Sequence, residues 1–245
     1  MKKINNLDKI NNLLKRKLVS FSFRYKFNNI FICESKYNAN YLSNFSGGVE
    51  TLIDVGVAQG TPELYAAFSN KKMLLIDPQP VPQTNLEEYK AKGYDMDTKQ
   101  ICLGSNKETG RLNLQGRGST LLKRTELTSR GDSKQVEVEV DTLDNVIEQN
   151  SYTGPFALKI DTEGYEIEVL KGAKNTLSQS SLVMIEASIK KRFLNSYKFS
   201  ELVNFMAQQD FELFDFLNYE PMRSPRYLDC LFLPSDSDLF ERVDI

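Results

Sequence analysis

The sequence predicts an α/β fold with a doubly wound, mostly parallel sheet and an antiparallel strand at one edge. From Thr51 onward, short apolar runs alternate with stretches of helical character, as they do in chains of βα units. Runs such as TLIDV, MLLID and FALKID are continuously apolar, which is typical of strands that are buried on both faces. The last two runs, FELFDF and YLDCLFL, have no helix between them, which indicates an antiparallel addition at one edge.

The first half of the sheet is expected to begin with TLIDV, residues 51–55, as a buried strand. TPELYAAFSN should then form a helix, because Thr61 is a good N-cap and Pro62 fits the first helical position. MLLID is the second strand, and it must end at Asp77 because three prolines follow closely. TNLEEYKAKG predicts a helix with Gly93 beyond its end, and KQICLG is the expected third strand.

The second half begins with a polar, glycine-containing segment near residues 106–134, which predicts an insertion of hairpins and loops. Valine and glutamate alternate in VEVEV, so this strand should have one solvent-exposed face. DTLDNVIEQN is expected as a short helix capped by Asp141. A buried strand (FALKID), a helix (YEIEVLKGAKNTL), a strand (LVMIEA) and a helix around SELVNFMAQQ should follow.

The N-terminal segment, residues 1–40, is expected to form a helical, basic extension packed on a single domain that spans residues 41–245. Apolar residues recur there at helical spacing, with lysines and an arginine among them. This pattern fits a docking helix with a solvated basic face, or a surface for an anionic membrane or a polyanionic acceptor.

The composition excludes several classes of site and partner. The chain has no histidine, so any proton transfer must use another side chain or a metal-bound water. A formal net charge of -2 gives no overall attraction to nucleic acid. Three cysteines without paired spacing argue against a local zinc or redox site and suit a reducing compartment. No apolar run is long enough for a membrane helix or the core of a signal peptide, so we expect a cytoplasmic protein.

The stretch LIDVGVAQG contains the first candidate binding residues. Asp54, Gly56 and Gly60 lie between a strand and a capped helix, where a turn can admit a ligand and a helix N-terminus can receive a carboxylate or phosphate. A plain connecting turn would give the same pattern. Asp77 ends the next strand, where it can accept hydrogen bonds from ribose hydroxyls or simply form a turn before Pro78. The middle glycine of a dinucleotide fingerprint is absent, which favours S-adenosylmethionine as the cofactor.

The stretch LKIDTEGYEIEVLKGA contains the second candidate set. Asp161 and Glu163 follow a buried strand, and Lys159 within that strand needs a partner or an outward direction. Asp161 or Thr162 would cap the next helix under the simpler interpretation. Alternatively, Asp161 and Glu163 form a carboxylate cluster over the transferred group, together with Glu186 at the end of LVMIEA.

These stretches, together with LLIDPQP and VDTLDNVI, occur in an order that resembles the FkbM-type methyltransferases, over roughly residues 40–233. The run from Lys159 to Ala173 is the most specific element. The resemblance implies the Rossmann-like class I methyltransferase fold and O-methylation of a hydroxyl on a small molecule, glycan or polyketide. Val57, Ala58 and Gln59 depart from the D-V-G-A-N-x-G turn that is frequent in such families.

The resemblance also implies roles for single residues. Asp54, Gly56 and Gly60 would hold the methionine part of S-adenosylmethionine, and Asp77 would bind its ribose. Leu103 and Gly104 would line the adenine, while Asp161 and Glu163 would face the methyl group and the acceptor.

The role of these acids in catalysis has two interpretations. Asp161 or Glu163 would act on the acceptor hydroxyl as general base or orienter, or a divalent metal would be held by Asp161, Glu163 and Glu186. Two other functions stay open, a nicotinamide-dependent oxidoreductase and a cofactor-binding scaffold without turnover.

Overall fold

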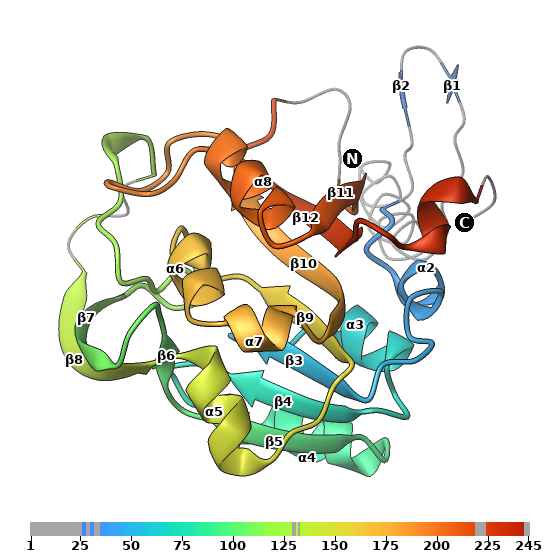
Figure 1. Ribbon diagram of the computed structural model, residues 1–245. Helices are drawn as coiled ribbons and strands as arrows, with labels where there is room; N and C mark the ends of the chain where they lie inside the picture. The colour runs from blue at the N-terminus through green and yellow to red at the C-terminus, as the bar shows by residue number, and fades with distance from the viewer. Residues whose placement is uncertain are drawn as a thin grey trace, which may run out of the picture.

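The computed structural model describes residues 26–27, 30–31, 35–128, 131, 133–218 and 224–242. Its centre is a seven-stranded sheet in the order β11-β12-β10-β9-β3-β4-β5 (Figure 1). Six strands run parallel, and β12 runs antiparallel to both of its neighbours, β10 and β11. The mostly parallel sheet with antiparallel pairing at one edge is therefore confirmed. The strands are β3 (Thr51–Val55), β4 (Lys72–Ile76), β5 (Asp95–Lys99), β9 (Phe156–Ile160), β10 (Ser180–Ser188), β11 (Phe211–Phe216) and β12 (Tyr227–Pro234).

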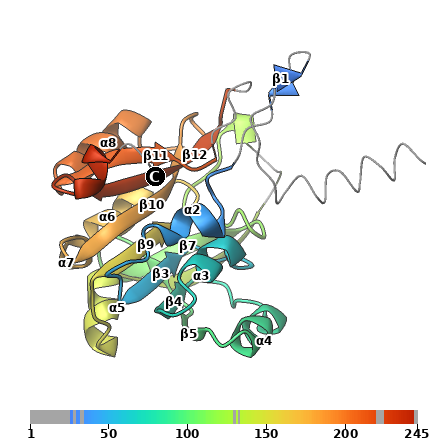
Figure 2. The same cartoon turned by 90° about the vertical axis from the view of Figure 1, so that its right-hand side faces the viewer.

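Helices cover both faces of this sheet (Figure 2). One face packs against α2 (Ala39–Ser43), α3 (Pro62–Ala67) and α4 (Gln83–Ala91). The other packs against α5 (Leu143–Asn150), α6 (Glu166–Lys171), α7 (Lys174–Leu177) and α8 (Phe199–Ala207). The central strands β3 and β9 are buried along their whole length, because each of their faces contributes to one of two apolar layers.

A smaller sheet in the order β6-β8-β7 lies beyond the carboxyl ends of the central strands (Figure 1, left). It consists of β6 (Cys102–Leu103), β7 (Glu108–Leu114) and β8 (Lys134–Asp141). Along β8 the valines point inward and the glutamates point outward, so the predicted solvent-exposed face is confirmed. Outside the two sheets, β1 (Lys26–Phe27) pairs with β2 (Ile30–Phe31), and short 3-10 helices span Glu126–Thr128 and Asp238–Glu241.

Three local predictions were wrong. The third strand of the large sheet is Asp95–Lys99, not KQICLG, in which Cys102 and Leu103 form β6 of the small sheet. The N-cap of α5 is Thr142, because Asp141 is still the last residue of β8. The helix expected over YEIEVLKGAKNTL is divided into α6 and α7 at Gly172, whose Cβ position is blocked by the carbonyl oxygen of Gly104 at 2.1 Å.

The predicted helix of residues 1–40 lies largely outside the described residues. Within the described part of the chain, no helix is long and apolar enough to cross a membrane. Cys102 and Cys230 are both buried free thiols.

Candidate functional site

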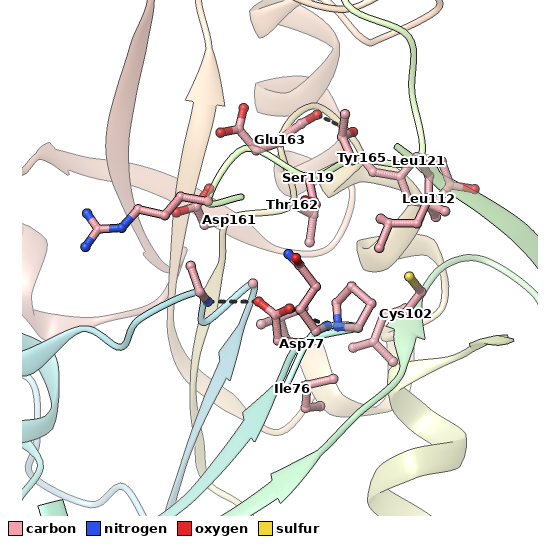
Figure 3. A pocket seen from close by; sticks show the side chains of 18 of the residues that line it. Ile76, Asp77, Cys102, Leu112, Ser119, Leu121, Asp161, Thr162, Glu163 and Tyr165 are labelled. Carbon is pink, nitrogen blue, oxygen red and sulfur yellow. Dashed lines mark hydrogen bonds between the residues drawn. The ribbon is translucent and has the colours of Figure 1, made fainter. Parts of the chain in front are cut away.

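A cavity opens where β3, β4 and β9 end and the small sheet begins (Figure 3). Five of the predicted site residues line this cavity: Gly56, Asp77, Leu103, Asp161 and Glu163. The other predicted binding residues, Asp54, Gly60 and Gly104, lie outside this lining. The carboxyl ends of adjacent parallel strands share one edge of a sheet, which is why residues far apart in sequence meet here.

The turn after β3 requires glycine at both predicted positions. Gly56 has φ +82° and Gly60 has φ +98°, a region that favours glycine. A Cβ on Gly56 would lie 1.8 Å from the carbonyl oxygen of Asp161, and one on Gly60 would lie 2.6 Å from the hydroxyl of Tyr89. The turn after β3 is thus packed directly against the turn after β9.

Asp54 is completely buried, and its carboxylate forms hydrogen bonds with residues that follow the turn. Its Oδ2 accepts hydrogen bonds from Tyr65 (2.6 Å) and from Thr61 (3.0 Å). Thr61 holds the N-cap position of α3 as predicted, but its hydroxyl binds Asp54 and makes no side-chain cap. Asp54 therefore fixes the start of α3 relative to β3.

Lys159 is the partner that balances the charge of Asp54. Its Nζ lies 3.1 Å from Asp54 Oδ1 and 3.5 Å from Asp161 Oδ2, and it donates to the carbonyl oxygen of Gly56 at 3.2 Å. Burial alone would lower the pKa of Lys159, but the two carboxylates outweigh it and raise the pKa. The lysine within the apolar run is therefore paired, and it joins the turns after β3 and β9.

Asp77 presents its carboxylate to the cavity from the end of β4. Oδ2 accepts from the backbone N–H of Ala58 and Oδ1 from that of Gln79, both at 2.8 Å. Burial raises the pKa of Asp77, and these two N–H groups oppose the rise. Part of the cavity wall is apolar. Figure 3 labels Ile76, Leu112 and Leu121 there, and Ile101 and Leu103 also line the cavity.

The turn after β9 is held by a buried glutamate that the sequence analysis did not single out. Glu166 Oε1 accepts from the backbone N–H of Thr162 (3.0 Å) and of Gly164 (2.9 Å). The N-cap of α6 is Tyr165, so neither Asp161 nor Thr162 caps the helix. Glu163 has φ +54°, a conformation that costs energy for a residue with a side chain.

A comparison with known protein families identifies the family of this chain. The model of the methyltransferase FkbM domain matches residues 54–213, which is more than half of the chain and includes the turns after β3, β4 and β9. The chain belongs to the FkbM methyltransferase family.

Solved structures resemble this FkbM chain only distantly. The 1,6-didemethyltoxoflavin-N1-methyltransferase of Burkholderia thailandensis, solved with 1,6-didemethyltoxoflavin and S-adenosylhomocysteine, has a TM-score of 0.44 at 12% identity, over 83% of this chain and 80% of that one. The fibrillarin pre-rRNA processing protein of Methanococcus jannaschii has a TM-score of 0.47 at 9% identity, over 89% and 84%. An O-methyltransferase family protein of Burkholderia thailandensis has a TM-score of 0.42 at 9% identity, over 80% and 55%. None of the curated proteins is a significant match.

Two arginines of the FkbM chain hold the carboxylate of Glu163. Arg192 Nη2 lies 2.5 Å from Glu163 Oε2, and Arg124 Nη2 lies 3.4 Å from the same oxygen. Arg192 also binds Glu186 through Nη1 at 2.8 Å. A guanidinium thus bridges two of the three acids that were candidates for a metal site. Among the residues that the structure describes, no three acidic or cysteine side chains form a group that could hold a metal ion.

Asp161, Glu186 and Asp229 form an acidic row across the ends of three adjacent strands. Ile160, just before Asp161, pairs with Ile185, and Glu186 pairs with Asp229. Burial and then the charge of Asp161 raise the pKa of Glu186 to about 9 and that of Asp229 to about 7. The positive charge of Arg192 opposes this rise in the pKa of Glu186, and that of Lys159 opposes the rise in the pKa of Asp229.

Proposed function

We propose that this chain transfers a methyl group from S-adenosylmethionine to a hydroxyl of a sugar, a glycan or another small molecule. The observation that carries the proposal is the carboxylate of Asp161, which lines the cavity and whose side chain is 30% exposed. Because the chain has no histidine, a carboxylate is a suitable group to accept a hydrogen bond or a proton from a hydroxyl.

The lining residues match an adenosyl cofactor in polarity. The Asp77 oxygens, which each accept one backbone N–H, keep lone pairs that can accept from two ribose hydroxyls. Ile101 and Leu103 supply an apolar surface for adenine, and Gly56 keeps the wall of the cavity free of a side chain.

The predicted binding residues that do not line the cavity, Asp54, Gly60 and Gly104, contact residues that lie around it. Asp54 holds Lys159 and the start of α3. Gly60 leaves room for the Tyr89 hydroxyl. A Cβ on Gly104 would lie 2.8 Å from Val140 and 3.3 Å from the ring of Tyr165, so glycine at this position lets the small sheet lie close to α6. We assign all three to shaping the cavity.

S-adenosylmethionine, when bound, supplies a methyl group on a positively charged sulfur that becomes neutral as the methyl leaves. A carboxylate beside that sulfur would stabilise the ground state more than the transition state. We therefore assign Asp161 to the acceptor, whose hydroxyl it would orient for in-line attack. Because two arginines engage Glu163, we assign Glu163 to holding the turn after β9.

The acceptor class is supported by the rest of the acidic row. Glu186 and Asp229 lie next to Asp161 along the sheet edge. Arg192 holds one oxygen of Glu186, and the remaining carboxyl oxygens of the row can accept hydrogen bonds from hydroxyls of a sugar. Cys102 and Cys230, which stay free thiols, support the cytoplasmic location that we also propose.

Replacing Asp77 by alanine is expected to weaken the binding of S-adenosylhomocysteine by about thirtyfold, because hydrogen bonds to a charged acceptor contribute about 1.5–3 kcal/mol. Isothermal titration calorimetry of the purified chain measures this affinity, with NAD titrated in parallel. Asp77→Asn, which keeps one oxygen acceptor, should lose less, and Asp95→Ala at an exposed position of β5 should stay within about twofold of the parent. Binding of NAD without binding of S-adenosylhomocysteine would contradict the proposal.

Replacing Asp161 by asparagine is expected to lower the rate of methyl transfer by about a hundredfold, with the affinity for S-adenosylhomocysteine changed by less than about threefold. Transfer of a radiolabelled methyl group to a panel of sugar and phenolic acceptors measures the rate. The exposed Asp236→Asn is the matched control. If Asp161→Asn transferred methyl groups at the parental rate, Asp161 would not be the group that acts on the acceptor. If no acceptor of the panel were methylated, a binding scaffold would be the better interpretation.

A further inference from the structure

A loop of the small sheet, residues 115–120, lies against the cavity and is anchored on two sides. On one side, Gln79 Nε2 donates to the carbonyl oxygen of Gly116 at 3.2 Å. On the other, Thr120 Oγ1 donates to the carbonyl oxygen of Glu163 at 2.8 Å, and Arg124 Nη2 donates to that of Gly118 at 2.7 Å. The loop therefore joins the turn after β4 to the turn after β9.

Arg117 is the basic side chain that this loop contributes to the cavity. Of the described lining residues it is the only one with a positive charge, whereas Asp77, Asp161 and Glu163 are acidic. Its guanidinium donates to the side-chain oxygen of Gln59, in the turn after β3. Arg117 is exposed, and it forms no salt bridge with any carboxylate in the described part of the chain.

We propose that Arg117 binds the carboxylate of the methionyl part of the cofactor, exchanging the neutral amide of Gln59 for it. This assignment rests on the proposed function. The acids of the cavity can match the ammonium and hydroxyl groups of S-adenosylmethionine, but its one carboxylate needs a donor that those acids cannot provide. Arg117 offers a guanidinium, which binds a carboxylate through two parallel N–H···O bonds.

The position of Gln59 determines which end of the cofactor Arg117 reaches. Gln59 lies between Gly56 and Gly60, the turn expected to hold the methionine part, whereas Asp77 and the apolar wall lie at the ribose and adenine end. Through its contact with Gln59, Arg117 lies against the turn after β3, and we assign it to the methionine end on that ground. The carboxylate would then fix residues 115–120 over the cavity, and cofactors that lack a carboxylate would miss this contact.

The experiment is calorimetric titration of the parent chain and its variants with two ligands, S-adenosylhomocysteine and 5′-methylthioadenosine, which lacks the amino and carboxyl groups. Arg117→Ala is expected to weaken the first ligand by about tenfold to fiftyfold and the second by less than about twofold. Arg117→Lys should recover part of the loss, because an ammonium retains the charge but not the bidentate geometry. Gln59→Ala should leave the affinity for S-adenosylhomocysteine unchanged or raise it, because Arg117 then gives up no hydrogen bond.

Arg111→Ala is the matched control, because Arg111 is also exposed but lies on β7 outside the lining of the cavity. It removes the same charge and should change neither affinity by more than about twofold. If Arg117→Ala bound S-adenosylhomocysteine like the parent, or lost affinity for both ligands equally, the carboxylate assignment would be overturned while the proposed function stood. If the parent chain bound 5′-methylthioadenosine but not S-adenosylhomocysteine, the assignment would be overturned too. Failure of the parent to bind either ligand would overturn the proposed function together with the assignment.

Discussion

Replacing Gly56 by alanine is expected to lower the free energy of unfolding by about 4 kcal/mol or more. Gly56 has φ +82°, where a side chain is strained, and its Cβ would lie 1.8 Å from the carbonyl oxygen of Asp161. That oxygen belongs to the backbone, and the N–H of Asp161 is itself bonded to the carbonyl of Val55 at 2.9 Å. The clash can therefore be relieved only if the turn after β9 moves away from β3. Urea unfolding followed by circular dichroism measures the loss.

The control for this prediction separates strain from collision. Gly93 has φ +84°, nearly the same conformation, but nothing lies within 4 Å of its Cβ position. Gly93→Ala should therefore cost only about 1 kcal/mol, the cost of the left-handed conformation. Equal losses in the two variants would show that the contact between the turns after β3 and β9 contributes little to stability.

The fold could be predicted from the sequence wherever an element is buried on both faces. The strands β3, β4 and β9 have continuous apolar runs, and their positions were predicted to within a residue or two. The edge strand β5 was missed because its sequence, DMDTK, has one buried apolar residue, Met96. A half-exposed strand of five residues gives too weak a pattern to compete with the apolar residues Ile101, Cys102 and Leu103 nearby.

The candidate site could be predicted only where acids follow strands. Asp77 and Asp161 were predicted at the strand ends that line the cavity, because parallel strands end at one edge of the sheet. Arg192 was not, because nothing in KKRFL distinguishes a buried ion-pair partner of Glu163 from a solvated basic residue. Asp229 lies within a strand, and only the insertion of β12 beside β10 brings it opposite Glu186. Partners that depend on strand order or on loop packing leave no local pattern.

Lys159 is the residue whose loss is expected to cost the second largest amount of stability. Lys159→Met keeps most of the length of the side chain but leaves the completely buried Asp54 with its charge uncompensated. Removing one partner of a buried ion pair typically costs about 3–5 kcal/mol, and here the donor to the carbonyl oxygen of Gly56 is lost as well. We expect a loss in this range, measured by urea unfolding in parallel with Gly56→Ala.

The double variant Lys159→Met with Asp54→Asn tests whether this loss of stability comes from the uncompensated charge of Asp54. The amide of asparagine can still accept from Tyr65 and Thr61, which donate to Asp54, so the double variant should recover at least half of the lost stability. Because the carboxylates raise the pKa of Lys159 above the ordinary 10.5, the contribution of the pair should be fully present below that value. It should decline only as the pH rises through the folded-state pKa. A double variant less stable than Lys159→Met would mean that the carboxylate of Asp54 stabilises α3 through Tyr65 and Thr61 even without the lysine, and that the ion pair is secondary to those two hydrogen bonds.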